Sequence, residues 1–203
     1  MNVTLKIVEC PQCGAPVRQQ RQQCEYCQVA LKVQTLSYLD HFDQSSVKKY
    51  LQHYKSIHTT FPDVPELNMS IGLCHLNLGL YDMARNHFLK VIEVEPDRSE
   101  AYYYVSLSII KKRKPKNLNL REAKQIERFL EIAIRITPTA KFYYLWAILK
   151  YEYYYKNGLR VTSPHYDELF AEGHACKKDH SELKSLLDHL TIEDPALLKV
   201  VFA

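Results

Sequence analysis

The sequence predicts a mainly α protein in which antiparallel helical hairpins stack into a solenoid, with a small four-cysteine metal site at the N-terminal end. Three observations support this prediction. Residues 65–96 read as two helices with apolar faces joined by a tight turn at Gly79. Residue patterns that typically cap the start of a helix recur along the chain after residue 96. Four of the six cysteines are closely spaced within residues 10–27.

Length and composition fit one helical domain with a small appendage. The chain has 203 residues, of which 46% are hydrophobic, and five glycines, so a substantial core is expected. A net charge of +4 is too weak alone to indicate a nucleic-acid partner. The N-terminus lacks a signal-peptide core, and the longest apolar run, residues 142–149, is far short of the ~20 residues of a membrane helix. Lone cysteines in predicted helices, Cys74 and Cys176, suit a reducing compartment, so we expect a cytoplasmic protein.

Residues 10–27 read CPQCGAPVRQQRQQCEYC, which is a C-x2-C-x10-C-x2-C spacing. Two residues between cysteines let a turn aim both sulfurs at one point, and Gly14 frees backbone N–H groups to bond the thiolates. Two such turns supply four soft ligands in a tetrahedron, which is the geometry that Zn²⁺ accepts. The predicted metal ligands are Cys10, Cys13, Cys24 and Cys27. Four cysteines leave no open coordination position, so we expect the zinc to be structural.

The spacing resembles that of a zinc ribbon, with CPQCG as the first knuckle and CEYC as the second. Residues 5–8 and 29–33 alternate enough to be expected to pair as short strands. Two disulfides are one alternative, and they would need an oxidising compartment. A redox-active C-x-x-C is another, and it would need a helix start in a βαβ setting, which the sequence does not indicate. A unit of about 30 residues also needs a metal to fold.

The helical part begins after a linker, with Asp43 as the predicted N-cap of a helix that ends near residue 59. Capping-box patterns predict the starts of four later helices: Asp63 with Glu66, Asp97 with Glu100, Asn119 with Glu122, and Asp179 with Glu182. Gly158 predicts a helix stop, and Pro164 the start of another helix. The segment from residue 140 to 155 is apolar and aromatic nearly all round, as expected of a helix between two layers.

Residues 65–96 also carry a family resemblance. Gly72 at the helix crossing, Gly79 at the turn, then Tyr81, Ala84, Phe88 and a closing Pro96 resemble a tetratricopeptide repeat. A second unit ends at Pro138, 42 residues after Pro96 against a family period of about 34, and a third begins at Lys141. The resemblance implies a repeat domain with C-terminal capping helices over residues 63–203. It would follow a ribbon at 1–33 and a linker with a first helix at 34–62.

In this family, the first helices of successive repeats line a concave groove that holds partners. The resemblance therefore implies an apolar and aromatic groove, which would suit an amphipathic helix or an extended apolar peptide of another protein. The alternative is that the chain's own terminal helices fill the groove. The residues expected to line it are Met69, Leu73, Tyr103, Leu107, Leu145, Leu149 and Tyr153.

Two basic stretches are candidate anion contacts, with solvated loops as the alternative. Their residues are Arg18 and Arg21 in the ribbon loop, and Lys111, Lys112, Arg113, Lys114 and Lys116 in residues 111–116. No glycine-rich phosphate loop, helical H-E-x-x-H or local nucleophile motif indicates an enzyme. The sequence therefore favours a non-enzymatic adaptor that binds proteins through the groove, the ribbon or both. The alternatives are a nucleic-acid-associated protein that uses the ribbon and the basic loop, and an enzyme with a site in the aromatic groove.

Overall fold

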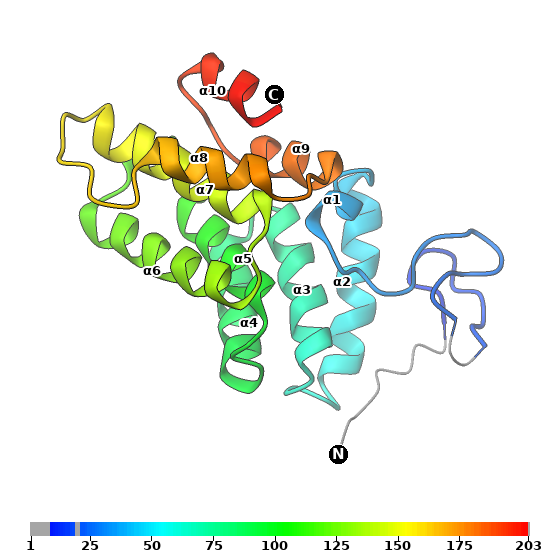
Figure 1. Cartoon of the computed structure of the whole chain (residues 1–203). Helices are drawn as coiled ribbons and strands as arrows, with labels where there is room; N and C mark the ends of the chain where they lie inside the picture. Colours follow the sequence, from blue (N-terminus) through cyan, green and yellow to red (C-terminus); the bar gives the residue numbers. More distant parts are fainter. Residues whose placement is uncertain (1–8, 19–20, 203) are drawn as a thin grey trace. The chain divides into compact units, whose positions relative to one another are not determined.

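The computed structural model describes residues 9–18 and 21–202, and the chain divides into two compact units, Met1–Pro96 and Asp97–Ala203 (Figure 1). The described residues form helices and no β-strand, which confirms the predicted mainly α fold. The predicted boundaries after residues 33 and 62 fall inside the first unit, and the predicted repeat domain is divided after Pro96.

In the first unit, the other helices pack against α3. In chain order they are α1 (Leu36–Leu39), α2 (Gln44–His58), α3 (Pro65–Asn77) and α4 (Tyr81–Val94). Helix α3 is buried continuously from Leu67 to Leu76, because α4 packs on it from one side and α2 from another (Figure 1). A helix that is apolar on two sides needs two covers. Here the neighbouring helices of the same unit supply both.

The α3–α4 hairpin depends on two glycines. A Cβ atom at Gly72 would lie 2.5 Å from Cε1 of Phe88, so the absence of a side chain lets the two helices approach. Gly79 has a φ of +74°, and it follows the end of α3 in the left-handed conformation that favours glycine. The N–H of Leu80 donates to the carbonyl of His75 and closes the turn. Both glycines therefore have the roles that the repeat-like pattern predicts for them.

The second unit continues the pairing of consecutive helices: α5 packs on α6, and α7 packs on α8 and on α6. Helix α9 contacts α7, and the C-terminal helix α10 contacts α8 and α9 (Figure 1). The bounds are α5 (Ser99–Ile110), the 3-10 turn η1 (Pro115–Asn117), α6 (Leu120–Ile136), α7 (Ala140–Leu149), η2 (Lys150–Tyr155), α8 (Tyr166–Ala175), α9 (His180–Asp188) and α10 (Pro195–Phe202).

The helix that was expected to run from residue 140 to 155 changes its winding at Lys150. Its last turn, η2, is a π-helix, in which the N–H of Lys156 donates to the carbonyl of Tyr151, five residues earlier. Lys150 and Glu152 in this segment are both buried, with exposed fractions of 1% and 0%. The π turn therefore carries charged side chains into the interior of the second unit.

The predicted capping box forms at Asn119, where the side-chain oxygen accepts from the N–H of Glu122 and the Glu122 carboxylate accepts from the N–H of Asn119. At Asp179 the carboxylate accepts from the N–H groups of Ser181 and Glu182 and so caps α9. The prediction for Asp63 with Glu66 is wrong. Helix α3 begins at Pro65 with Val64 as its N-cap, and no side chain caps it. Proline at the first helical position has no N–H to satisfy and its φ already suits the helix, so it sets the start without a carboxylate. Helix α5 likewise begins after Arg98 rather than after Asp97.

Candidate metal centre

The four cysteines of the predicted metal site converge at the N-terminal end of the first unit. All four Sγ atoms lie within 4.8 Å of one another, and the Cys10–Cys27 and Cys13–Cys24 pairs are 3.6 Å apart. Tetrahedral zinc with Zn–S bonds of about 2.3 Å requires sulfurs about 3.8 Å apart. The described thiols are free, and their spacing excludes disulfide bonds. The donor set therefore fits a metal ion coordinated by four sulfurs.

Two nearly identical turns build this arrangement. In the first, the N–H of Gln12 points at Cys10 Sγ (3.4 Å), and the N–H of Gly14 donates to the carbonyl of Cys10 (2.9 Å). In the second, Tyr26 N–H points at Cys24 Sγ (3.4 Å), and Gln28 N–H donates to the carbonyl of Cys24 (3.0 Å). Gly14 and Gln28 both have positive φ, so the second turn keeps the backbone of the first without its glycine.

Backbone donors and burial move the thiol pKa values in opposite directions. Backbone N–H groups, Cys27's first and Tyr26's also, lower the pKa of Cys24 to about 6. Burial raises the pKa of Cys10 to about 12, against the effect of the N–H groups of Cys13 and Gln12. Burial also raises the pKa of Cys27. Four thiolates cannot coexist this closely without a cation, and a bound metal ion would hold all four deprotonated.

The segment after the second turn is anchored to the helices by tyrosine hydroxyls. Tyr50 donates to the carbonyl of Ala30 (2.8 Å), and Tyr54 donates to the carbonyl of Leu31 (3.0 Å) and accepts from the N–H of Val33 (3.0 Å). This anchoring explains why the first unit includes the cysteine site. Of the predicted strands, residues 5–8 lie outside the described residues. Residues 29–33 form no strand and contribute one isolated bridge, Gln23 to Ala30.

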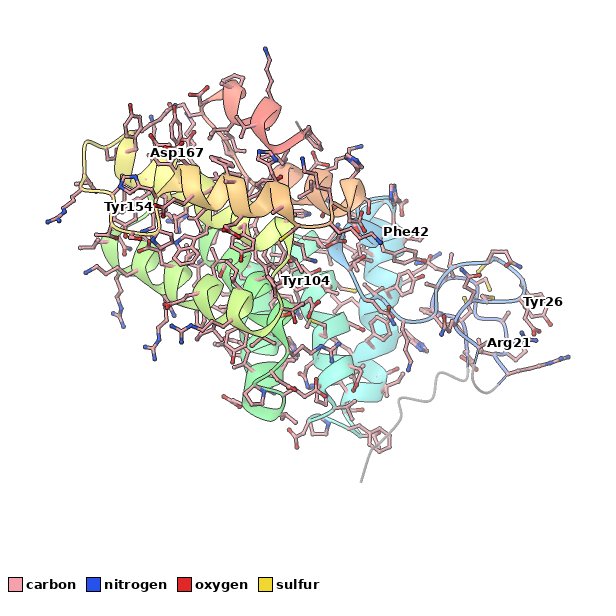
Figure 2. The ribbon with its side chains drawn as sticks, in the orientation of Figure 1. Arg21, Tyr26, Phe42, Tyr104, Tyr154 and Asp167 are labelled. Carbon is pink, nitrogen blue, oxygen red and sulfur yellow. The ribbon has the colours of Figure 1, made fainter. Side chains whose placement is uncertain are left out.

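The predicted ribbon presents exposed side chains in its described part, residues 9–18 and 21–33. Tyr26, between two of the ligands, is 70% exposed and points outward from the turn (Figure 2). Arg21 forms an ion pair with Glu25 (2.9 Å), and Arg18 lies 3.9 Å from the same carboxylate. The two arginines predicted as anion contacts thus lie near the same carboxylate, that of Glu25, which offsets part of their charge.

The predicted basic loop is largely paired within the second unit. Arg113 contacts Glu122 (2.7 Å), and Glu193 accepts from Lys116 (2.6 Å) and Lys114 (3.4 Å). Lys111 and Lys112 both have positive φ at the end of α5. The role of this loop in anion binding remains a prediction, and acidic side chains of the same unit already offset part of its charge.

The residues predicted to line the groove are buried, with exposed fractions of 6% or less: Met69, Leu73, Tyr103, Leu107, Leu145, Leu149 and Tyr153. Their side chains contribute to packing in the structure. A partner could contact them only after neighbouring helices moved, so binding at these positions remains a prediction.

Sequence reasoning missed a buried polar cluster in the first unit. The side-chain oxygen of Asn68 accepts from His87 (2.8 Å) and from His58 (3.3 Å), and the rings of His87 and His75 are 5.3 Å apart. In the resemblance to a tetratricopeptide repeat, Asn68 and His75 stand at the positions of the pattern's tryptophan and tyrosine. These two polar residues at core positions were the sequence signal that could have revealed the cluster. Neither ring nitrogen of His75 has a partner among the described residues.

Fold and site together define a mainly α protein of paired helices with a four-cysteine site at one end. No family model matches the chain. A stretch of 61 residues is 38% identical to Protein CTR9 homolog of Arabidopsis thaliana, and it covers 30% of this chain and 6% of that protein. The chain thus spans a small part of this relative. Within residues 9–18 and 21–202, none of the helices has the length and apolar character needed to cross a bilayer.

Proposed function

We propose that this protein is a non-enzymatic cytoplasmic adaptor that binds other proteins. The observation that carries the proposal is the pairing of consecutive helices, α3 with α4, α5 with α6 and α7 with α8. Repeated helical hairpins typically offer surfaces that bind protein segments. The close approach at Gly72 and Phe88, with the turn at Gly79, supports the tetratricopeptide-like character of the first pair.

The metal in this proposal is a structural Zn²⁺ held by the four cysteines. Sulfur donors at tetrahedral spacing favour zinc, and a site closed by four protein ligands has no position for a substrate or a water nucleophile. The role of the ion is to hold the two turns together. Since Gln12 donates to the carbonyl of Ser46 (2.8 Å), the metal also helps to hold the first turn against α2.

The proposed contact surface for a protein partner is the exposed end of the ribbon around Tyr26. Tyrosine and arginine are enriched among the residues that dominate binding energy, because they offer a large rigid area and directed hydrogen bonds. Tyr26 offers such an area on a turn between two of the cysteines, and Arg21 is paired with Glu25, the residue before it (Figure 2). The groove residues could bind an apolar helix or peptide only after rearrangement, so the ribbon is the readier surface.

Affinity capture with the zinc-loaded full chain tests this proposal. Tyr26→Ala should reduce recovery of the specific protein partners, whereas Phe61→Ala should not; Phe61 is another exposed aromatic residue of the first unit, 45% exposed. Equal recovery with both variants would place the interface elsewhere, for example in the groove. Loss of all captured material after nuclease treatment, with a steep salt dependence, would favour the nucleic-acid alternative.

A further inference from the structure

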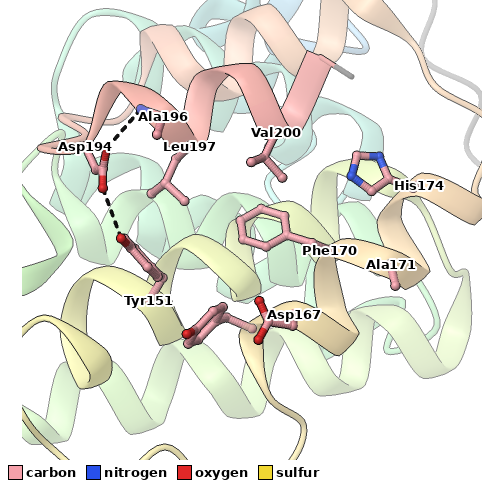
Figure 3. A pocket seen from close by; sticks show the side chains of 10 residues that line it. Tyr151, Asp167, Phe170, Ala171, His174, Asp194, Ala196, Leu197 and Val200 are labelled. Carbon is pink, nitrogen blue, oxygen red and sulfur yellow. Dashed lines mark hydrogen bonds between the residues drawn. The ribbon is translucent and has the colours of Figure 1, made fainter.

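A pocket of about 400 Å³ lies in the second unit between α8, the π segment η2 and the start and body of α10 (Figure 3). Its volume is within the range of small-molecule sites. The ring of Phe170 from α8 lies at its centre, and Leu197 and Val200 face this ring from α10 (Figure 3). This part of the pocket is apolar, so it suits the carbon chain of a ligand.

Two aromatic rings and two carboxylates form the rest of the lining. Tyr151 and Tyr166 are nearly perpendicular, with ring centroids 5.2 Å apart. Asp194 accepts from the hydroxyl of Tyr151 (3.0 Å) and from the N–H of Ala196 (2.9 Å) (Figure 3). Asp167, in the first turn of α8, is exposed, and its carboxylate forms no ion pair or hydrogen bond within the described part of the chain.

The charges around the pocket are predominantly negative. Buried Glu152 accepts from the N–H of Asp194 (3.2 Å), so it adds a third carboxylate near the two in the lining. Lys156 supplies a counter-charge, with its Nζ 3.5 Å from Asp194 and 3.8 Å from Glu152. The ten lining residues include no lysine or arginine. Lys156 is thus shared by Asp194 and Glu152, and Asp167 adds a third carboxylate to the pocket.

The ionisable side chains of the lining respond to this environment. The hydrogen bond to Asp194, followed by burial, raises the pKa of Tyr151 to about 12. Burial and the charge of Asp167 raise the pKa of Tyr166. Burial, with Lys178, lowers the pKa of His174. Both phenols and the imidazole are therefore neutral near pH 7, and the tyrosines offer neutral aromatic faces.

The part of the lining formed by Tyr151 and Asp194 already contacts one ammonium group. Nζ of Lys156 lies 5.5 Å from the centroid of the Tyr151 ring, in addition to its contact with Asp194. A cation over a tyrosine face and beside a carboxylate is stabilised by the ring quadrupole and by the charge. The carboxylate of Asp167, which also lines the pocket, has no such ammonium partner within the described part of the chain.

We propose that this pocket binds an organic monocation, an amine whose apolar chain packs on Phe170, Leu197 and Val200 and whose ammonium group lies beside Asp167. The ligand is either a free small amine or a lysine side chain presented by a protein. This site is independent of the proposed contact at Tyr26. It adds a binding activity to the second unit that the adaptor role does not require.

Isothermal titration of the full chain with three probes of similar shape tests the charge preference. Phenethylamine should bind about fivefold more tightly than phenethyl alcohol, since a partly exposed charge pair contributes modestly, and hydrocinnamate should bind most weakly. Asp167→Asn should abolish the preference for the amine while leaving the alcohol unaffected. Glu172→Gln is the matched control, because Glu172 is an exposed carboxylate on the same helix outside the lining.

A fourth probe, Nα-acetyl-lysine methylamide, separates the two sources of the amine. Binding as tight as that of phenethylamine supports a lysine side chain as the ligand, and weaker binding supports a free amine. The proposal is overturned if none of the probes binds, if the alcohol or the acid binds as tightly as the amine, or if Asp167→Asn and Glu172→Gln have the same effect.

Discussion

Nζ of Lys150 lies 2.7 Å from Oε1 of Glu127 although the lysine is 1% exposed. The same ammonium donates to the carbonyl and the hydroxyl of Thr162 (3.1 and 3.2 Å). Glu127 also accepts from Trp146 Nε1 (3.3 Å) and from the Tyr154 hydroxyl (2.7 Å). Because this network joins α6, α7 and η2, it fixes the π segment within the second unit.

Removing one member of this pair should be costly. Lys150→Met leaves the carboxylate of Glu127 poorly compensated, and we expect a loss of about 3 kcal/mol in the free energy of unfolding. The double variant with Glu127→Gln keeps the acceptor for Trp146 and Tyr154, so it should be less destabilised than the sum of the two single variants. Urea unfolding of the four proteins measures the coupling. Strictly additive losses would contradict a coupled pair.

Gly72→Ala should destabilise the first unit, because the new methyl group would lie 2.5 Å from the fully buried ring of Phe88. Overpacking of this kind costs about 1–3 kcal/mol. In thermal unfolding, Phe88→Leu in the same chain should relieve part of that cost and give a positive coupling. A Gly72→Ala variant as stable as the parent would show that the helices can separate without penalty.

Removal of the metal should loosen the cysteine turns and leave the helices intact. Chelation should increase hydrogen exchange in the described residues between 9 and 29, whose turns depend on the cysteines. Val33 should stay protected, since its N–H donates to Tyr54. Helical circular dichroism should change little. Metal analysis should give one zinc per chain, lost in Cys13→Ser and kept in the control Cys176→Ser. Exchange spreading through α2 and α3 would instead make the ribbon integral to the helical core.

Acid should destabilise the first unit through its buried histidines. Burial, and then Lys55, lowers the pKa of His75 from 6.5 to about 4. Burial, with the neighbouring His75 and His58, lowers that of His87 to about 4 as well. The unfolded chain therefore binds more protons between these values, and stability is lost as pH falls from 6.5 towards 4.

His75→Leu tests this pH dependence. Since neither ring nitrogen of His75 has a partner within the described residues, the variant should be at least as stable as the parent at pH 7. It should also lose less stability on acidification. Chemical unfolding at several pH values measures both effects. An unchanged slope of stability against pH would assign the acid sensitivity to other groups.

Local patterns in the sequence were sufficient for several features. The C-x2-C spacing predicted the four-sulfur cluster, because a two-residue turn by itself directs both sulfurs to one point. Gly72, Gly79 and the capping box at Asn119 were also predicted correctly. The start of α3 was missed because Pro65 is a sufficient start signal, and the carboxylate pattern around Asp63 was not needed.

The sequence by itself determined the helical hairpins and the cysteine cluster, since both depend on residues a few positions apart. The tertiary structure alone decided which apolar faces became buried, and it buried Leu73 and Tyr103, which the repeat pattern had assigned to an open groove. It also paired Lys116 with Glu193, 77 residues later, and Glu127 with buried Lys150. Burial and charge pairing depend on which surfaces meet, and residue spacing along the chain does not specify that.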